Sequence, residues 1–267
     1  MSDSATETSA ASPEVVRFEA RGRVAVITLD RPAQRNAVNG ALAAGLEAAV
    51  DRLEEDDALW LGVIVGNGRV FCAGADLKAV AAGEGNTLGT ERGGFAGFVA
   101  RERTKPIIAA CDGPALAGGC EIALACDLIV ASTESYFAVP EVKRSLAAAA
   151  GGLFRLPQVL PRNVATEMIL TGDPVPAERA HALGMVNRLC EPGDALDTAL
   201  GLAEQIAVNA PLAVRESLAV TKEAKGLDDA AAFDRSNEAM RRLARTDDFA
   251  EGPRAFIEKR APEWKGR

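Results

Sequence analysis

The apolar residues of this chain follow two spacings, one typical of strands and one typical of amphipathic helices. Over residues 15–29 they alternate with polar residues around Gly22, which predicts two short strands joined by a turn. Over residues 39–56 they recur every three or four positions, which predicts a helix with one buried face. A short apolar run at 61–65 predicts a third strand. The chain therefore begins with strand, strand, helix and strand.

The next segments repeat the succession of strand, glycine-rich turn and helix. The third strand leads through a glycine turn into a helix that begins near Asp76. A strand at 106–111 leads through a second glycine turn into a helix at 119–126, and another strand follows at 127–131. This alternation indicates an α/β fold.

Other segments interrupt or follow this repeat. Residues 81–97 hold six glycines among small and polar residues, which favours a mobile surface loop, and a helix is expected to resume at 95–104. Beyond residue 139 the pattern is mostly helical, with breaks at Gly151–Gly152 and Pro161, and it ends in three or four helices.

Length and composition indicate one packed domain. The 267 residues are 48% apolar and 25% charged, close to an average globular domain. No long linker divides them, so we expect an α/β core at 15–200 and a helical region at 201–267. Residues 1–14, rich in Ser, Ala and Thr, have neither a basic nor an apolar leader segment, which predicts a mobile tail on a cytoplasmic protein.

Charge and residue counts exclude several classes of function. A net charge of −8 and only 12 aromatic residues disfavour a nucleic-acid-binding protein. The longest apolar tract, 106–131, contains three acidic residues, so no membrane span is expected. The five cysteines lack CxxC spacing, and the single histidine, His181, lies in a helical pattern without nearby ligands. These features predict free buried thiols, a solvated or capping histidine and no metal site.

Two glycine turns and two glutamates carry the candidate chemistry. The turns at 71–76 and 115–121 each precede a helix, where unpaired backbone N–H groups and the helix dipole favour an oxyanion. Glu121 and Glu141 lie among apolar residues, and desolvation raises a carboxyl pKa toward neutrality. Each feature alone also fits a tight connection or a helix cap, but together they suggest an acid and a base beside one carbonyl.

At these residues the chain resembles the crotonase, or enoyl-CoA hydratase/isomerase, superfamily. The resemblance covers nearly all of the chain after the tail, and the order and spacing of its motifs are specific. The motifs are RPAQRNAV at 31–38, FCAGADL at 71–77, ALAGGCEIALACDLIVA at 115–131, FAVPEV at 137–142 and LTGDPVPAERAHALGMVNRL at 170–189.

The resemblance implies a spiral of ββα repeats with a C-terminal helical region used in trimerisation, as a homotrimer or as a hexamer made of two trimers. It implies that the backbone N–H groups of Ala75 and Gly118 hold the thioester oxygen. In family members that hydrate enoyl-CoA, glutamates that match Glu121 and Glu141 hold the water that adds to C3.

The resemblance also places coenzyme A, which is part of the substrate and not a separate cofactor. The implied CoA-binding residues are Gln34, Arg35, Ala37, Ala73, Asp76, Leu77 and Lys78. Arg35 and Lys78 are the candidates for the phosphates, with simple solvation as the alternative. Asp76 and Asp127 are more often helix caps than catalytic groups, so neither is a catalytic candidate.

The leading hypothesis is an enoyl-CoA hydratase that uses both glutamates. In isomerase-like members one glutamate can suffice, commonly the one that matches Glu141. An isomerase, another acyl-CoA lyase such as a polar acyl-CoA hydratase, and a non-catalytic acyl-CoA binding protein therefore remain alternatives. The chain departs from many hydratases at Val139, where they have Gln, and at 145–150, where alanines replace a glycine-rich loop and favour a helix. Both changes bear on the acyl group that is accepted.

Overall fold

The computed structural model describes residues 14–267. The tail expected at 1–14 lies outside the described residues, apart from the exposed Glu14. None of the described helices combines the length and the apolar character needed to cross a membrane. The five cysteines, all in the described part, are free as expected.

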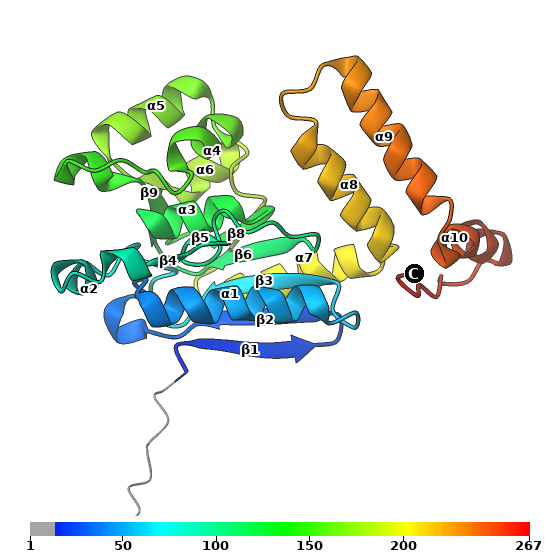
Figure 1. The fold of residues 1–267 in the computed structure, drawn as a ribbon, viewed down its shortest axis with the longest axis horizontal. Coiled ribbons are helices and arrows are strands. Elements are labelled where there is room, and N and C mark those ends of the chain that lie inside the picture. The colour runs from blue at the N-terminus through cyan, green and yellow to red at the C-terminus, as the bar shows by residue number, and fades with distance from the viewer. Residues whose placement is uncertain (1–13) are drawn as a thin grey trace, which may run out of the picture.

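A six-stranded sheet forms the centre of the fold (Figure 1). Its first two strands pair antiparallel around the Gly22 turn, and all later neighbours are parallel. In sheet order the strands are β1 (Val16–Arg21), β2 (Val24–Leu29), β3 (Leu61–Gly66), β6 (Ile107–Cys111), β8 (Leu128–Ser132) and β11 (Arg188–Cys190). The predicted strands, including those at 15–29, 61–65, 106–111 and 127–131, are confirmed.

Two helices cover opposite faces of this sheet. Helix α1 (Gly40–Glu55) begins at Asn39, whose side chain accepts a hydrogen bond from the Leu42 N–H at 3.0 Å. Its apolar positions, among them Leu46 and Val50, are buried in the main core. Helix α7 (Ala195–Ala207) packs its alanines on the other face of the sheet, in a second apolar cluster.

Two shorter sheets and the remaining helices complete the fold. One small sheet has the order β10 (Val175–Pro176), β9 (Tyr136–Ala138) and β7 (Ala115–Leu116), and the other pairs β4 (Gly89–Thr90) with β5 (Gly94–Phe95). The remaining α-helices are α2 (Leu77–Ala81), α3 (Gly118–Ala125), α4 (Gly152–Val159), α5 (Arg162–Thr171), α6 (Ala177–Ala182), α8 (Pro211–Glu223), α9 (Asp229–Leu243) and α10 (Asp247–Glu258). Five α-helices therefore follow residue 172 within the described chain, where three or four were expected.

The prediction of a helix at 95–104 was wrong. These residues form turns after β5, because Gly97 approaches α1 so closely that a Cβ there would lie 2.3 Å from the Ala43 carbonyl oxygen. Arg92 of the preceding loop and Arg101 of these turns each form an ion pair with Asp51 of α1. The glycines therefore serve close backbone approach, and the loop expected to be mobile is held against a helix.

The alanine-rich segment at 145–150 is also not helical, contrary to its expected preference. A 3-10 helix over Pro140–Arg144 ends at Ser145, which has a φ of 58°, and Gly151 has a φ of 125°. Left-handed backbone at both ends of the segment interrupts a helix, and the helix preference of alanine is too small to override this backbone conformation.

Asp127 joins the C-terminal helices to the core. Its carboxylate pairs with Arg103 in a site where both side chains are nearly fully buried, and it accepts a hydrogen bond from the Ile107 N–H at 2.8 Å. Lys222 of α8 reaches the same carboxylate at 2.8 Å. Asp127 thus has a structural role, but as the partner of two cations and of a strand N–H group and not as the helix cap that was expected.

We expect Asp127→Asn to lower the free energy of unfolding by about 3 kcal/mol, because the buried Arg103 guanidinium then lacks an ionised partner. Lys222→Met is the matched control, and its half-exposed ion pair should contribute less than about 1 kcal/mol. Denaturant unfolding of the two variants measures both values. Equal stability of Asp127→Asn and the unsubstituted protein would contradict this role.

Candidate active site

The two glycine turns lie in direct contact. Gly74 has a φ of +86°, and a Cβ at this position would lie 2.9 Å from the Gly118 nitrogen and 2.8 Å from the Ala117 Cβ. A bridge between Cys72 and Ala115 aligns the first turn with β7, and a bridge between Val38 and Ala75 aligns it with the segment before α1. Because only glycine leaves room for this approach, Gly74 brings the two predicted turns together.

The backbone N–H groups of Ala75 and Gly118 have no hydrogen-bond partner within residues 14–267. Gly118 is the first residue of α3, so its N–H lies at the positive end of the helix dipole. The Phe95 ring occupies the space of a Gly118 side chain, since a Cβ there would lie 2.3 Å from the Phe95 Cε1. Such a pair of donors can bind an oxyanion.

Glu121 lies one turn further along α3 and is only 3% exposed. Its Oε1 accepts a hydrogen bond from the Gly152 N–H at 2.9 Å. Burial raises the pKa of Glu121 to about 7, which this hydrogen bond opposes and the neighbouring charge of Glu141 reinforces. A carboxyl with this pKa can give or take a proton near neutral pH.

Glu141 lies on the 3-10 helix after β9, and burial also raises its pKa. Its Oε2 is buried and has no hydrogen-bond partner in the described part of the chain. The structure thus brings the two glutamates predicted from the sequence into one apolar neighbourhood, with one carboxyl oxygen free to bind a reactant or a water molecule.

The two departures from the hydratase pattern lie beside Glu121. A Cβ at Gly152 would lie 2.8 Å from the Ala148 Cβ and 3.3 Å from both the Val139 Cγ1 and the Glu121 Oε1. Val139 and Ala148 are both buried. Their methyl groups and the Glu121 carboxyl all lie around Gly152, which is consistent with the desolvation of Glu121.

The two segments expected to bind CoA run side by side. The Ala73 N–H donates to the Arg35 carbonyl at 3.0 Å, and the Val38 N–H donates to the Gly74 carbonyl at 2.8 Å. The Asp76 N–H then donates to the Val38 carbonyl at 2.8 Å. This pairing brings the candidate residues of both segments together next to Ala75.

The side chains of these CoA candidates differ in their surroundings. Gln34, Arg35, Leu77 and Lys78 are exposed, Ala73 is half-buried and Ala37 is buried. Arg35 lines a groove of about 560 Å³ together with Arg69 and Tyr136. Asp76 pairs with Arg31 at 3.0 Å and accepts from the Lys78 N–H at 3.0 Å, which is the geometry of a helix cap.

Two residues near the site were not identified from the sequence. Arg155 lies on α4 and its positive charge lowers the pKa of Glu121, while Phe95 contacts Gly118. Arg155 stands in an amphipathic helical pattern, and Phe95 in a glycine-rich loop, so neither position carries a local signal for a site. The glycine pair at 151–152 was visible, but only as a helix break.

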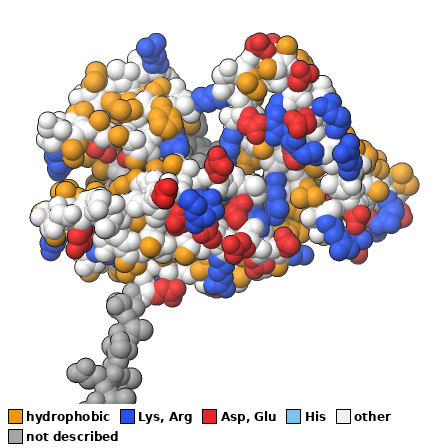
Figure 2. Space-filling model, viewed as in Figure 1, with side chains coloured by type: hydrophobic (Ala, Val, Ile, Leu, Met, Phe, Trp, Pro, Cys, Tyr) orange, Lys and Arg blue, Asp and Glu red, His pale blue; other side chains and the backbone are white. Residues whose placement is uncertain are grey.

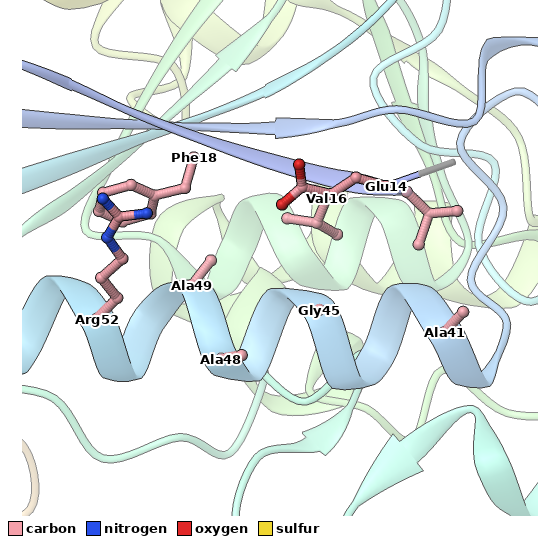
Figure 3. A pocket seen from close by; sticks show the side chains of 9 residues that line it. Glu14, Val16, Phe18, Ala41, Gly45, Ala48, Ala49 and Arg52 are labelled. Carbon is pink, nitrogen blue, oxygen red and sulfur yellow. The ribbon is translucent and has the colours of Figure 1, made fainter. Parts of the chain in front are cut away.

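A separate groove of about 390 Å³ lies between β1 and α1 (Figure 3). Small residues such as Gly45 and Ala49 form its floor, and the Arg52 guanidinium stacks 4.2 Å from the centre of the Phe18 ring at one end. None of the candidate site residues lines this groove, so it is distinct from the site around Glu121.

Comparison with known proteins identifies the family of this chain. The sequence model of the enoyl-CoA hydratase/isomerase family matches residues 19–267. A carnitinyl-CoA dehydratase from Proteus mirabilis is 40% identical over 257 residues, which cover 92% of this chain and 97% of that protein.

Solved structures give the same result. An enoyl-CoA hydratase from Mycobacterium tuberculosis H37Rv superposes with a TM-score of 0.92 at 47% identity, covering 95% of this chain and all of that one. A carnitinyl-CoA hydratase from Mycobacterium avium gives a TM-score of 0.76 at 44% identity, covering 96% of this chain and all of that one. The chain therefore belongs to the enoyl-CoA hydratase/isomerase family of the crotonase superfamily and has the crotonase fold.

We expect Glu121→Gln to stabilise the protein by an amount that grows as the pH rises above about 4.5. The folded protein holds the Glu121 proton more tightly than the unfolded chain, so its stability falls as pH rises from 4.5 through about 7. Glutamine keeps an oxygen for the Gly152 N–H but cannot ionise. Its advantage should be absent at pH 4 and reach up to about 3 kcal/mol at pH 9.

Thermal melting across this pH range measures the effect, with the exposed Glu134→Gln as the control. A stability difference between Glu121→Gln and the unsubstituted protein that does not change with pH would show that Glu121 is not desolvated in the folded state.

Proposed function

We propose that this protein hydrates the 2,3 double bond of 2-enoyl-CoA thioesters. The observation that carries the proposal is that the buried Glu121 and the partly buried Glu141, both with raised pKa values, lie in one site with two unpaired backbone N–H groups. The two N–H donors by themselves could stabilise the oxyanion of any thioester reaction. The second carboxyl favours water addition over a proton shift that one glutamate can carry out.

The oxyanion donors act on the thioester carbonyl. As the water oxygen bonds to C3, the π electrons of the double bond move toward the carbonyl and give an enolate. The Ala75 and Gly118 N–H groups would donate to that oxygen, and their stabilisation grows as its negative charge develops. Their contact through Gly74 fixes the spacing before the substrate binds.

The two glutamates would handle the protons. The ionised carboxyl accepts a proton from the attacking water, and the protonated carboxyl donates a proton to C2, so one water is added in total. Raised pKa values allow one glutamate to be protonated while the other is ionised near neutral pH. In the reverse direction, the same groups remove water from a 3-hydroxyacyl-CoA.

The CoA part would lie along the paired segments that include Gln34, Arg35, Ala37 and 73–78. Backbone groups of Ala37, Ala73 and Asp76 border this surface, and Leu77 is 59% exposed, so its side chain can contact the ligand. Arg35 and Lys78 are exposed cations suited to phosphates.

A polar acyl-CoA is the second candidate substrate. The observation that favours it is the 40% identity to a protein named carnitinyl-CoA dehydratase, which extends over nearly the whole of both chains. The same glutamates and the same oxyanion donors would serve this reaction. Only the pocket that receives the acyl group would differ.

Purified protein should remove the enoyl-thioester absorbance of 2-enoyl-CoA esters, tested on chains of different length. If the polar substrate is the preferred one, dehydration of carnitinyl-CoA should instead produce this absorbance. Glu121→Gln and Glu141→Gln should each reduce turnover by at least about 100-fold, since each removes a proton-transfer group. Both variants should still bind an acyl-CoA. Glu134→Gln, an exposed substitution, is the control.

Other outcomes would support other functions. Isomerisation of a 3-enoyl-CoA that needs Glu141 but not Glu121 would support an isomerase. Tight binding of acyl-CoA without turnover of any ester would support a binding protein.

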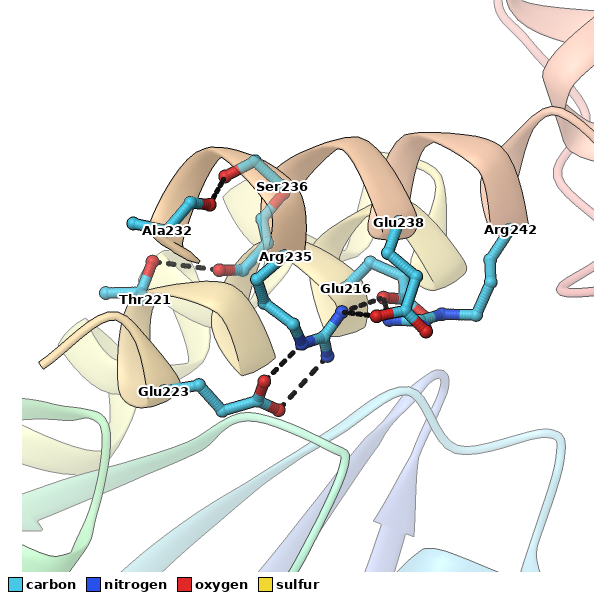
Figure 4. Close-up of polar contacts among 9 residues, drawn as sticks. Glu216, Thr221, Glu223, Ala232, Arg235, Ser236, Glu238 and Arg242 are labelled. Carbon is cyan, nitrogen blue, oxygen red and sulfur yellow. Dashed lines mark hydrogen bonds and ion pairs between the residues drawn. The ribbon is translucent and has the colours of Figure 1, made fainter. Parts of the chain in front are cut away.

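We also propose that the C-terminal helices mediate assembly into a homotrimer, or into a hexamer of two trimers. Helices α8 and α9 form a hairpin joined by ion pairs of Arg235 with Glu223 and of Arg242 with Glu216 (Figure 4). Figure 1 shows this hairpin standing apart from α4 and α5, and Figure 2 shows apolar side chains at the outer edge of α10. Phe256 and Ile257 there are 86% and 78% exposed. Such a surface favours a partner copy.

Sedimentation of the unsubstituted protein should give at least three times the chain mass of 27.8 kDa. The double substitution Phe256→Asp and Ile257→Asp should shift it to smaller species, because charges at a buried apolar contact remain unpaired. Leu170→Asp, at another strongly exposed apolar position, on α5, is the control. A monomeric unsubstituted protein would overturn the proposed assembly.

A further inference from the structure

Arg155 connects two chain segments that border the candidate site. Its guanidinium donates to the Val99 carbonyl at 2.6 Å and to the Ala150 carbonyl at 3.2 Å. These carbonyls belong to the turn after β5 and to the segment before α4, which are far apart in the sequence. The side chain is half-buried and stacks 5.0 Å from the centre of the Phe154 ring. One planar group thus fixes two otherwise irregular segments.

The packing around this guanidinium is close. A Cβ at Gly151 would lie 2.0 Å from the Arg155 Nη1, so the backbone at 151 is in contact with the cation. Gly151 also has a φ of 125°, a conformation that side chains disfavour. The path of the chain from Ala150 to Gly152 therefore depends on Arg155.

This stretch of backbone faces the Glu121 carboxyl. The Gly152 N–H donates to the Glu121 Oε1, and the backbone of Ala150 also lowers the pKa of Glu121. The charged groups that act on Glu121 are Glu141, from the 3-10 helix after β9, and Arg155, from α4. Arg144, on the same 3-10 helix, acts on Glu141. Arg155 is thus the cation of the described chain whose charge acts on Glu121.

We propose that Arg155 is a positioning residue for Glu121, which holds the 150–152 backbone against the carboxyl and supplies the positive charge that allows a buried glutamate to ionise. This role rests on the proposed function, in which Glu121 exchanges a proton with the substrate or with water. Arg155 itself touches backbone carbonyls and takes no part in the bond changes.

The two contributions of Arg155 act in the same direction. Its charge lowers the pKa of Glu121, and so do the backbone groups that it holds. Burial acts in the opposite direction and raises this pKa to about 7. Without Arg155 both of the contributions that lower the pKa of Glu121 weaken. Glu121 should then keep its proton to a higher pH.

The test measures the titration of Glu121 directly and does not depend on turnover. Infrared difference spectra recorded against pH follow the protonated carboxyl band, which is assigned to Glu121 by its absence in Glu121→Gln. In Arg155→Met the midpoint should rise by about half a pH unit or more, and in Arg155→Gln by a similar amount. Arg155→Lys, which keeps the charge, should show a smaller rise.

Arg52→Met is the matched control, because Arg52 also stacks on a phenylalanine but lies on α1 beside β1. It should leave the midpoint unchanged. If Arg155→Met does not fold, Arg155→Gln gives the same comparison. A midpoint in folded Arg155→Met or Arg155→Gln equal to that of the unsubstituted protein would overturn the proposal, even if stability had fallen.

The infrared midpoint and the hydration assay separate the two proposals. If the unsubstituted protein turns over no enoyl-CoA but Arg155→Met shifts the midpoint, the proposed function fails and the role of Arg155 remains. If the protein is a hydratase, the limb of its pH–turnover profile that reports Glu121 should move to higher pH in Arg155→Met by the same amount as the midpoint. A uniform loss of turnover at every pH, with no shift of the midpoint, would reduce Arg155 to a structural residue.

Discussion

The close approach of two backbone turns at Gly74 and Gly118 is the constraint on which the site depends. No side chain fits between them, so the first turn needs glycine at 74. In the second turn, the Phe95 ring fills the space that a side chain at position 118 would occupy. This contact places an N–H group from each of two separate strand-to-helix units side by side. The repeat of strand, turn and helix, seen already in the apolar pattern, is what brings the two units into register.

The position of Glu121 depends on the same contact, because Glu121 follows Gly118 on α3. The helix that presents one oxyanion donor also carries the carboxyl, and the next segment, through Val139, Ala148 and Gly152, closes around it. Desolvation then raises the pKa of Glu121, and Arg155 opposes that rise from α4. Backbone geometry and carboxyl chemistry are therefore determined by one set of packing contacts.

The parts of the fold with regular periodicity were predictable. The hairpin around Gly22, the helix at 39–56 and the parallel strands follow from spacing alone, and the motifs around Glu121 and Glu141 indicated the site. The turns at 95–104 and 145–150 were not predictable, because close approach of Gly97 to α1 and left-handed backbone at Gly151 override the preferences of their residues. Arg155 was missed for a related reason, since its partners are backbone carbonyls that no side-chain motif reveals.

Ala117, directly before the donor at Gly118, has a φ of 51° and a ψ of −127°, a conformation that an alanine disfavours. The Ala117 N–H donates a hydrogen bond to the Ala138 carbonyl at 2.8 Å, and the Ala117 methyl group packs near Gly74. The chain on its own would not adopt this shape, so neighbouring strands must impose it. An isolated peptide with the same motif would lack the donor geometry, and the capacity to stabilise an oxyanion is thus a property acquired only when the β7 and β9 strands have paired.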